Sequence, residues 1–122
     1  MQKILNGIKK FKSDVFPGLE PLFKKLRGDQ KPEVLFITCA DSRVVPALIT
    51  QTDPGDMFLV RIAGNIVPPY GEVHGGVTAT IEYALMVLKV RHVVVCGHSD
   101  CGVVKAMLHP EKLSNVPVVE SW

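Results

Sequence analysis

Two continuous apolar runs, each followed directly by a short polar cluster, most constrain how this chain folds. The first run covers residues 34–38 (VLFIT) and the second covers residues 93–96 (VVVC). Both are rich in β-branched residues and do not alternate, which is typical of parallel strands covered on both faces. We therefore expect an α/β fold with a mostly parallel central β-sheet flanked by helices, in a Rossmann-like arrangement of three layers.

Periodicity and breaker residues predict the other elements. A strand is expected over 57–62, an irregular loop over 67–76, a helix over 77–88 whose inner face holds Val77, Ile81, Ala84, Leu85 and Leu88, and a further helix between Gly102 and Pro110. Apolar spacing also predicts a helix over 4–11 and a second short helix after Pro21. These two would form an N-terminal helical arm over 1–29, within a single domain over 1–122.

The polar clusters after the two runs predict a metal site. Cys39 follows the first run, and His98 and Cys101 follow the second. The carboxyl ends of parallel strands meet at one edge of the sheet, so we expect these three side chains to converge. Two thiolates and an imidazole are donors that Zn2+ prefers, and three protein ligands leave a fourth position for water or substrate. Cys96, two residues before His98, is an alternative source of the second sulfur, although a buried core cysteine is the commoner role.

The metal is expected to be catalytic rather than structural. A structural zinc site is normally closed by a fourth Cys or His, and this chain has three cysteines and no C-x2-C pair. Asp41 and Arg43 alternate with Cys39 along the chain, so their side chains should point the same way. The Asp41 carboxylate could then orient zinc-bound hydroxide, while Arg43 keeps that carboxylate ionised. A surface ion pair without catalytic meaning is the alternative.

Composition restricts the partners. The 122 residues carry 14 basic and 12 acidic side chains, a net charge of +2, which is too small a field for nucleic-acid or membrane partners. No apolar stretch approaches the length of a membrane span. An odd number of cysteines argues against a disulfide framework and for a reducing compartment, so a cytoplasmic location is expected. The lysines opposite the apolar stripe of the first helix would also suit a membrane surface.

Together these residues resemble the β-class carbonic anhydrases. The motifs that carry the resemblance are CADSR (39–43), AGN (63–65) with Pro68 and Pro69, Gly75-Gly76 leading to IEYA (81–84), and CGHSDCG (96–102). They occur in order from about Gln30 to Ala106, and as a set they are highly specific.

The resemblance implies reversible hydration of CO2 to bicarbonate and a proton, by attack of hydroxide bound to one Zn2+ per chain. It implies zinc on Cys39, His98 and Cys101, with Asp41 and Arg43 as a catalytic dyad. The implied contacts to substrate involve Gln30, the backbone amide of Gly102, and an apolar CO2 pocket lined by Phe58, Ala63 and Tyr83. Phe58 would come from a neighbouring subunit, which implies a homodimer or a higher homo-oligomer.

The chain departs from this family in length and in one pocket residue. It ends where β-class enzymes usually continue with further strands and helices, so the usual C-terminal part is missing and the implied activity needs testing. A zinc-stabilised α/β interaction module without catalysis is therefore the alternative function. Members with a regulatory bicarbonate pocket carry a Trp where this chain has Phe36, although Arg61 would suit that pocket. Some members close the zinc site with the aspartate at low pH, and we expect the open form here.

Two other classes of enzyme fit less well. A cysteine phosphatase loop places its arginine six residues after the nucleophile, whereas Arg43 is four residues after Cys39. A dinucleotide-binding enzyme would carry G-x-G-x-x-G after a strand, which this sequence lacks. His74, in the 67–76 loop, could act as a proton shuttle near the cleft, because histidine titrates near neutral pH.

Overall fold

A computed structural model describes residues 1–71 and 75–122 of the chain. Its contacts divide the chain into two units, Met1–Gln30 and Lys31–Trp122. The expected shuttle residue, His74, lies outside the described residues. Within the described part, no helix is both long and apolar enough to cross a lipid bilayer.

The first unit is helical from Gln2 to Leu26. Three segments follow one another without a break: α1 (Gln2–Lys10), the π-helix η1 (Phe11–Val15) and α2 (Phe16–Leu26). The Phe16 ring lies 6.0 Å from that of Phe11 and 5.7 Å from that of Phe23, so an aromatic row spans the junction between η1 and α2. The expectation that a second helix starts after Pro21 is wrong, because Pro21 lies inside α2. There it lacks the amide for one backbone hydrogen bond and its ring crowds the preceding turn, yet the helix continues through it to Leu26.

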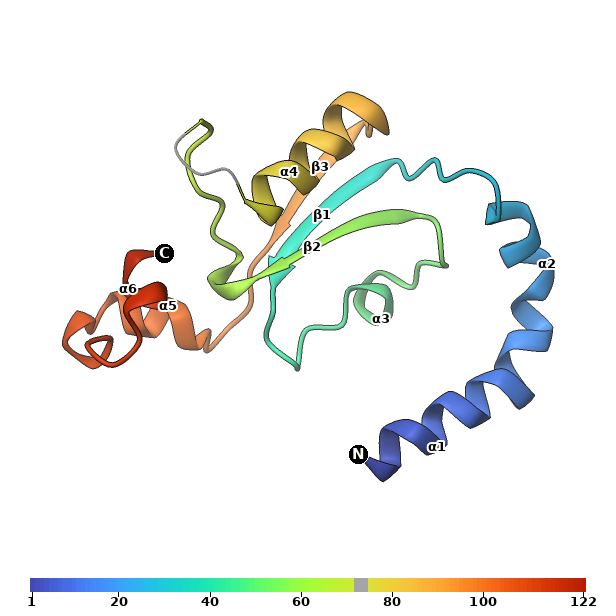
Figure 1. The fold of residues 1–122 in the computed structure, drawn as a ribbon, viewed down its shortest axis with the longest axis horizontal. Helices are drawn as coiled ribbons and strands as arrows, with labels where there is room; N and C mark the ends of the chain where they lie inside the picture. The colour runs from blue at the N-terminus through green and yellow to red at the C-terminus, as the bar shows by residue number, and fades with distance from the viewer. Residues whose placement is uncertain (72–74) are drawn as a thin grey trace. The chain divides into compact units, whose positions relative to one another are not determined.

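The second unit is built on a three-stranded parallel sheet, as expected. Its strands are β1 (Val34–Cys39), β2 (Met57–Ile62) and β3 (His92–Cys96), in the spatial order β2-β1-β3 (Figure 1). Cys39 pairs with Ile62 of β2, and Thr38 pairs with Cys96 of β3. The carboxyl ends of all three strands therefore lie at the same edge of the sheet.

One face of the sheet carries the hydrophobic core. Leu35 and Ile37 of β1 and Val60 of β2 are buried there together with Ala84. The covering elements are α4 (Gly76–Glu82) and the π-helix η3 (Tyr83–Val87), which together occupy nearly the whole span expected for a helix over 77–88. Val77 and Ile81 also pack on this core, as expected, but Leu85 is 44% exposed, so its assignment to the inner face is wrong.

The other face is flanked by a short helix that the sequence pattern did not predict. This helix, α3 (Pro46–Thr50), follows the loop after β1, and the Thr50 hydroxyl lies 3.9 Å from the sulfur of Met57 in β2. Thr50 also lines a cavity with Phe36 and Val94 of the sheet. Helices therefore flank both faces, as an α/β architecture requires.

The expectation that both apolar runs are covered on both faces holds for β1 but not for β3. β1 is buried from Leu35 to Cys39, whereas Val93 is 53% exposed and Val95 is 62% exposed. The core formed with α4 and η3 involves β1 and β2, and β3 pairs with β1 at the edge of the sheet. An apolar run therefore does not by itself show that the described residues cover that strand.

Short helical segments complete the second unit. The 3-10 turn η2 (Ala63–Asn65) follows β2, and α5 (Gly102–Met107) follows β3 and ends before Pro110, as expected. The 3-10 turn η4 (Pro110–Lys112) and α6 (Pro117–Ser121) were not predicted. Trp122, directly after α6, donates a hydrogen bond from its indole nitrogen to the Ala63 carbonyl at 3.2 Å. The C-terminal segment therefore contacts the turn that follows β2.

Candidate metal centre

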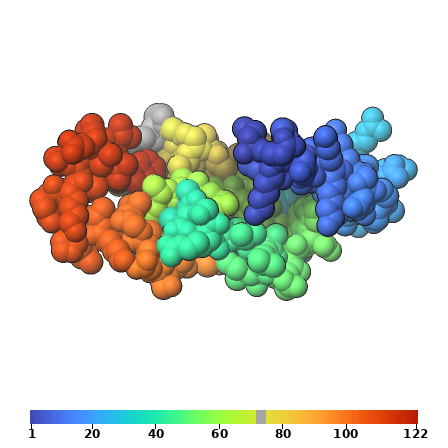
Figure 2. Space-filling view, turned by 90° about the horizontal axis from the view of Figure 1, so that it is seen from below, coloured from blue at the N-terminus to red at the C-terminus, as the bar shows by residue number. Residues whose placement is uncertain are grey.

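The parallel sheet brings together the three expected metal ligands. Cys39 is the last residue of β1, and His98 and Cys101 lie in the segment between β3 and α5. The segment after β1 lies beside this second segment in the space-filling view, where they are turquoise and orange (Figure 2). One potential ligand atom from each of the three residues lies within 4.8 Å of the others, and the two sulfurs are 3.9 Å apart. Cys39 and Cys101 are both buried.

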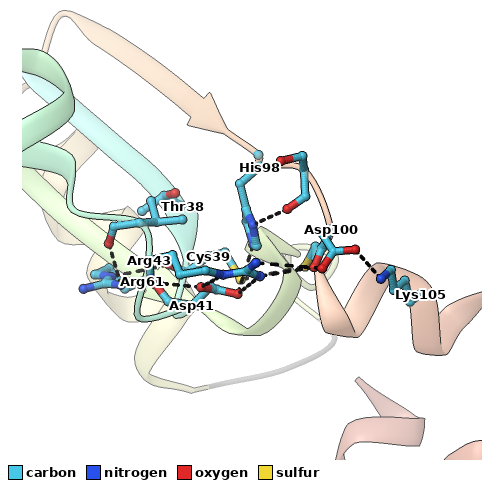
Figure 3. Close-up of polar contacts among 12 residues, drawn as sticks. Thr38, Cys39, Asp41, Arg43, Arg61, His98, Asp100 and Lys105 are labelled. Atoms are coloured by element: carbon cyan, nitrogen blue, oxygen red, sulfur yellow. Dashed lines mark hydrogen bonds and ion pairs between the residues drawn. The ribbon is translucent and has the colours of Figure 1, made fainter.

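His98 is oriented for binding a metal. Its ring nitrogen Nδ1 lies 2.9 Å from the Ser99 carbonyl, and because a carbonyl only accepts, Nδ1 carries the proton (Figure 3). The other nitrogen, Nε2, is buried and has no hydrogen-bond partner among residues 1–71 and 75–122. Buried polar atoms are nearly always satisfied, so this nitrogen marks the position where a ligand would bind. A backbone carbonyl on the second nitrogen is the usual support of a metal-binding histidine.

The spacing of the donors fits zinc. Sulfurs about 2.3 Å from a tetrahedral zinc would be separated by about 3.8 Å, which matches the observed separation of 3.9 Å. Burial raises the pKa of Cys39, but the neighbouring polar groups, chiefly the Asp41 amide and then the His98 ring and the Gly64 amide, outweigh it and lower the pKa to about 7. A thiolate, the form that binds metal, is therefore accessible near neutral pH.

The amide that reaches Cys39 from η2 depends on a glycine. Gly64 is buried and has φ of +68°, a left-handed conformation that favours glycine. A Cβ atom here would lie 2.9 Å from Cγ1 of Val103, so α5 packs directly on the glycine. Gly64 thereby allows the turn to approach both α5 and the Cys39 sulfur.

Asp41 and Arg43 form the expected ion pair beside the three ligands. Arg43 donates from Nε to Oδ1 of Asp41 at 3.0 Å and from a terminal nitrogen to Oδ2 at 2.8 Å, and its backbone amide also donates to Oδ1 at 2.9 Å. These bonds hold the pKa of Asp41 well below its usual range and raise that of Arg43. Oδ2 of Asp41 lies 3.9 Å from Nε2 of His98. An ionised carboxylate therefore borders the donor cluster.

Asp100 contacts the same arginine from the opposite side. Its carbonyl accepts a hydrogen bond from Arg43 at 3.2 Å, and its carboxylate forms an ion pair with Lys105. The Lys105 bond lowers the pKa of Asp100. Figure 3 shows Arg43 between the two aspartates. The segments after β1 and β3 are thus joined by charged contacts as well as by the ligands.

The other expected site residues are not all gathered at this cluster. Ala63 and Gly102 begin η2 and α5, which both adjoin it. The Phe58 ring packs at a tilt against that of Tyr83, with centroids 6.0 Å apart, and Phe58 pairs with Leu35, four residues before the Cys39 end of the sheet. At about 3.3 Å per residue, Phe58 lies about 13 Å along the strand from that end. Gln30 belongs to the first unit.

Of the two cysteines considered for the second sulfur, Cys101 is the one that lies in the donor cluster. The donor cluster contains Cys101, whereas Cys96 lies 3.5 Å from the carbonyl of Gly97. Sequence reasoning missed the supporting contacts of the site, including the Ser99 carbonyl and the Gly64 amide, because backbone groups leave no signal in side-chain patterns. It also missed Thr38, which is fully buried in β1 and donates to the Cys96 carbonyl of β3 at 2.8 Å.

The fold and the site together define the class of protein: an α/β protein with a candidate metal centre. That centre is a Cys-His-Cys set at the carboxyl edge of a parallel sheet, with an Asp-Arg pair beside it. The comparisons identify the family within that class. The family model described as carbonic anhydrase matches residues 34–122. The chain belongs to the carbonic anhydrase family, and its structural neighbours place it in the β class.

Individual relatives agree with this assignment. A carbonic anhydrase of Pseudomonas aeruginosa is 50% identical over all of this chain, which covers 56% of that protein. The solved structure of the β-carbonic anhydrase CcaA matches with a TM-score of 0.96 at 46% identity, over 100% of this chain and 60% of that one. A tetrameric β-carbonic anhydrase of Sordaria macrospora matches with a TM-score of 0.77 at 39% identity, over 88% of this chain and 53% of that one. The chain therefore spans a little over half the length of these relatives.

Proposed function

We propose that this chain binds one Zn2+ through Cys39, His98 and Cys101 and catalyses the reversible hydration of CO2 to bicarbonate and a proton. The observation that carries the proposal is the buried, unpartnered Nε2 of His98, which faces two sulfurs that are 3.9 Å apart. Family membership supplies the reaction. When bound, zinc would lower the pKa of water and so provide a nucleophile at neutral pH.

The chain's own residues would orient the reaction. The Asp41 carboxylate borders the donor cluster and can accept a hydrogen bond from the attacking solvent molecule, which fixes the direction of its lone pair. Arg43 keeps Asp41 ionised, so the carboxylate accepts rather than donates at neutral pH. Because Asp41 is engaged by Arg43 through both oxygens, this geometry favours an open fourth metal position over one closed by the aspartate.

The substrate contacts are part of the proposal. The Gly102 amide and Ala63 adjoin the cluster, while Gln30 would hydrogen-bond bicarbonate. Phe58 contacts Tyr83 and lies on β2, far from the Cys39–His98–Cys101 cluster of its own chain. This position suits the idea that Phe58 lines the CO2 pocket of a neighbouring subunit. If Phe58 lines a neighbour's pocket, the proposed active form is a homo-oligomer. A cytoplasmic location accords with three free cysteines.

A zinc-stabilised interaction module without catalysis is the second candidate. The observation that favours it is the exposure of the β3 valines, Val93 at 53% and Val95 at 62%. Exposed apolar residues on an edge strand are suited to binding another chain.

Zinc content and CO2 hydration, measured together, would separate the two functions. We expect one zinc per chain and measurable turnover by stopped-flow. Asp41→Asn should retain zinc and lose about a hundredfold in kcat, whereas the control Asp53→Asn, in the exposed turn before β2, should match the parent chain. Zinc without turnover would favour the interaction module, and a reduced, metal-replete chain that binds no zinc would contradict both.

A further inference from the structure

The loop that carries the Asp41–Arg43 pair has little regular structure of its own. It runs from the end of β1 at Cys39 to the start of α3 at Pro46. Its backbone bonds include a turn, Val44 amide to Asp41 carbonyl at 3.0 Å, and an anchor to β2, Ala40 amide to Ile62 carbonyl at 3.0 Å. The position of the dyad therefore depends on additional contacts.

Arg61 supplies three such contacts from the neighbouring strand. Its guanidinium donates to the carbonyl of Cys39 at 3.4 Å, to that of Asp41 at 2.8 Å and to that of Val44 at 2.9 Å. Figure 3 shows its side chain reaching this loop from β2. One side chain thus connects the metal-ligand end of the loop, its catalytic middle and its end before α3.

The geometry of the contact requires arginine. A guanidinium has five donors in a rigid plane, so it can bind several carbonyls at fixed angles, whereas a lysine ammonium is a compact charge on a flexible stem. Hydrogen bonds with a charged donor are also stronger than neutral ones. The carbonyl of Asp41 accepts both the Arg61 bond and the turn bond from Val44, so loss of Arg61 weakens the loop at its centre.

We infer that Arg61 is a positioning residue for the proposed reaction: by binding the carbonyls of Cys39, Asp41 and Val44, it holds the Asp41–Arg43 pair against the metal centre. The catalytic part of this inference rests on the proposed function. Its structural part, the ordering of residues 40–45 by Arg61, does not. The two parts can therefore be tested separately.

The structural test is hydrogen exchange in the zinc-loaded chain, followed by mass spectrometry of peptides that cover residues 40–45. We expect Arg61→Lys to speed exchange in this loop about tenfold and Arg61→Met to speed it further, with little change in peptides from β3. Arg91→Lys is the matched control, because Arg91 pairs with Glu33 at the opposite end of the sheet. It should leave exchange in the 40–45 loop unchanged.

The catalytic test is CO2 hydration by the same variants. We expect Arg61→Lys to lower kcat about tenfold with KM within twofold of the parent, and Arg61→Met to lower kcat further, while zinc content stays at one per chain. A graded fall in kcat at constant zinc content indicates a positioning role for Arg61. A general loss of folded protein would instead lower zinc content and kcat together.

Unchanged exchange over 40–45 in Arg61→Lys would overturn the inference, and that variant decides the matter if Arg61→Met does not fold. Equal acceleration in all peptides would also overturn it, because a global loss of stability is not loop positioning. A parent chain that binds zinc but shows no turnover would refute the proposed function instead, and the exchange result would still decide whether Arg61 orders the loop.

Discussion

Replacement of Gly64 by alanine tests whether close packing at η2 supports the metal centre. At φ of +68°, an alanine would occupy the left-handed region, at a cost of about 1–2 kcal/mol. Its Cβ would also lie 2.9 Å from Cγ1 of Val103, and relief of such overpacking costs about 1–3 kcal/mol. The less flexible unfolded chain offsets about 0.4–1 kcal/mol. We therefore expect Gly64→Ala to lower the free energy of unfolding by about 1–5 kcal/mol.

Gly71 provides a control that separates the two costs. It also has a positive φ, +86°, but a Cβ there would meet no heavy atom of the described residues within 4 Å. Gly71→Ala should therefore cost only about 1 kcal/mol, the net effect of backbone strain and the unfolded chain. The difference between the two variants measures the steric contact with Val103.

Urea unfolding at saturating zinc would give both values. Val103→Ala removes the contacting Cγ1 atom, so Gly64→Ala should cost less in that background than in the parent chain. Equal losses in Gly64→Ala and Gly71→Ala, with no effect of the Val103 background, would refute the packing argument. It would mean that α5 moves away from the turn without cost.

Three further outcomes are expected. His98→Ala should abolish stoichiometric zinc binding, measured by elemental analysis after dialysis, because two sulfurs alone lack the third donor; retention of one zinc per chain would contradict the assigned ligand set. Zinc affinity, measured by competition with a chromophoric chelator, should fall about tenfold or more per pH unit below pH 7. The reason is that a proton must leave Cys39, whose pKa is about 7, before the metal binds. An affinity independent of pH from 5 to 7 would contradict this. Thr38→Val should lower the free energy of unfolding by about 1 kcal/mol in urea, because the buried hydroxyl that bonds the Cys96 carbonyl is lost, and a neutral result would show that this bond adds no net stability.

The sheet and the donor residues could be predicted from the sequence because their signals are local. An apolar run of four to six residues identifies a strand wherever that strand lies, and the runs at 34–38, 57–62 and 93–96 correspond closely to β1, β2 and β3. Cys39 and His98 could be recognised as donors from their residue types and from their positions at strand ends. The helix α3 was missed because five residues are too few to show a 3.6-residue period.

Exposure and helix continuity could not be read in this way. Val93 and Val95 have the composition of core residues but are exposed on the edge strand, because burial depends on which elements cover a strand. Pro21 lies inside α2, although proline is tolerated best in the first turn of a helix, so its position shows that the local rule does not decide where this helix begins.

Residue types and strand patterns alone indicate which side chains could form a zinc site and which strands they end or follow, because side-chain chemistry and strand periodicity are properties of short segments. The folded chain, by contrast, places Cys101 rather than Cys96 in the donor cluster and brings Arg61 to the carbonyls of the dyad loop. These choices depend on distances of a few ångströms between segments that are 17 to 62 residues apart, which the folded sheet alone establishes.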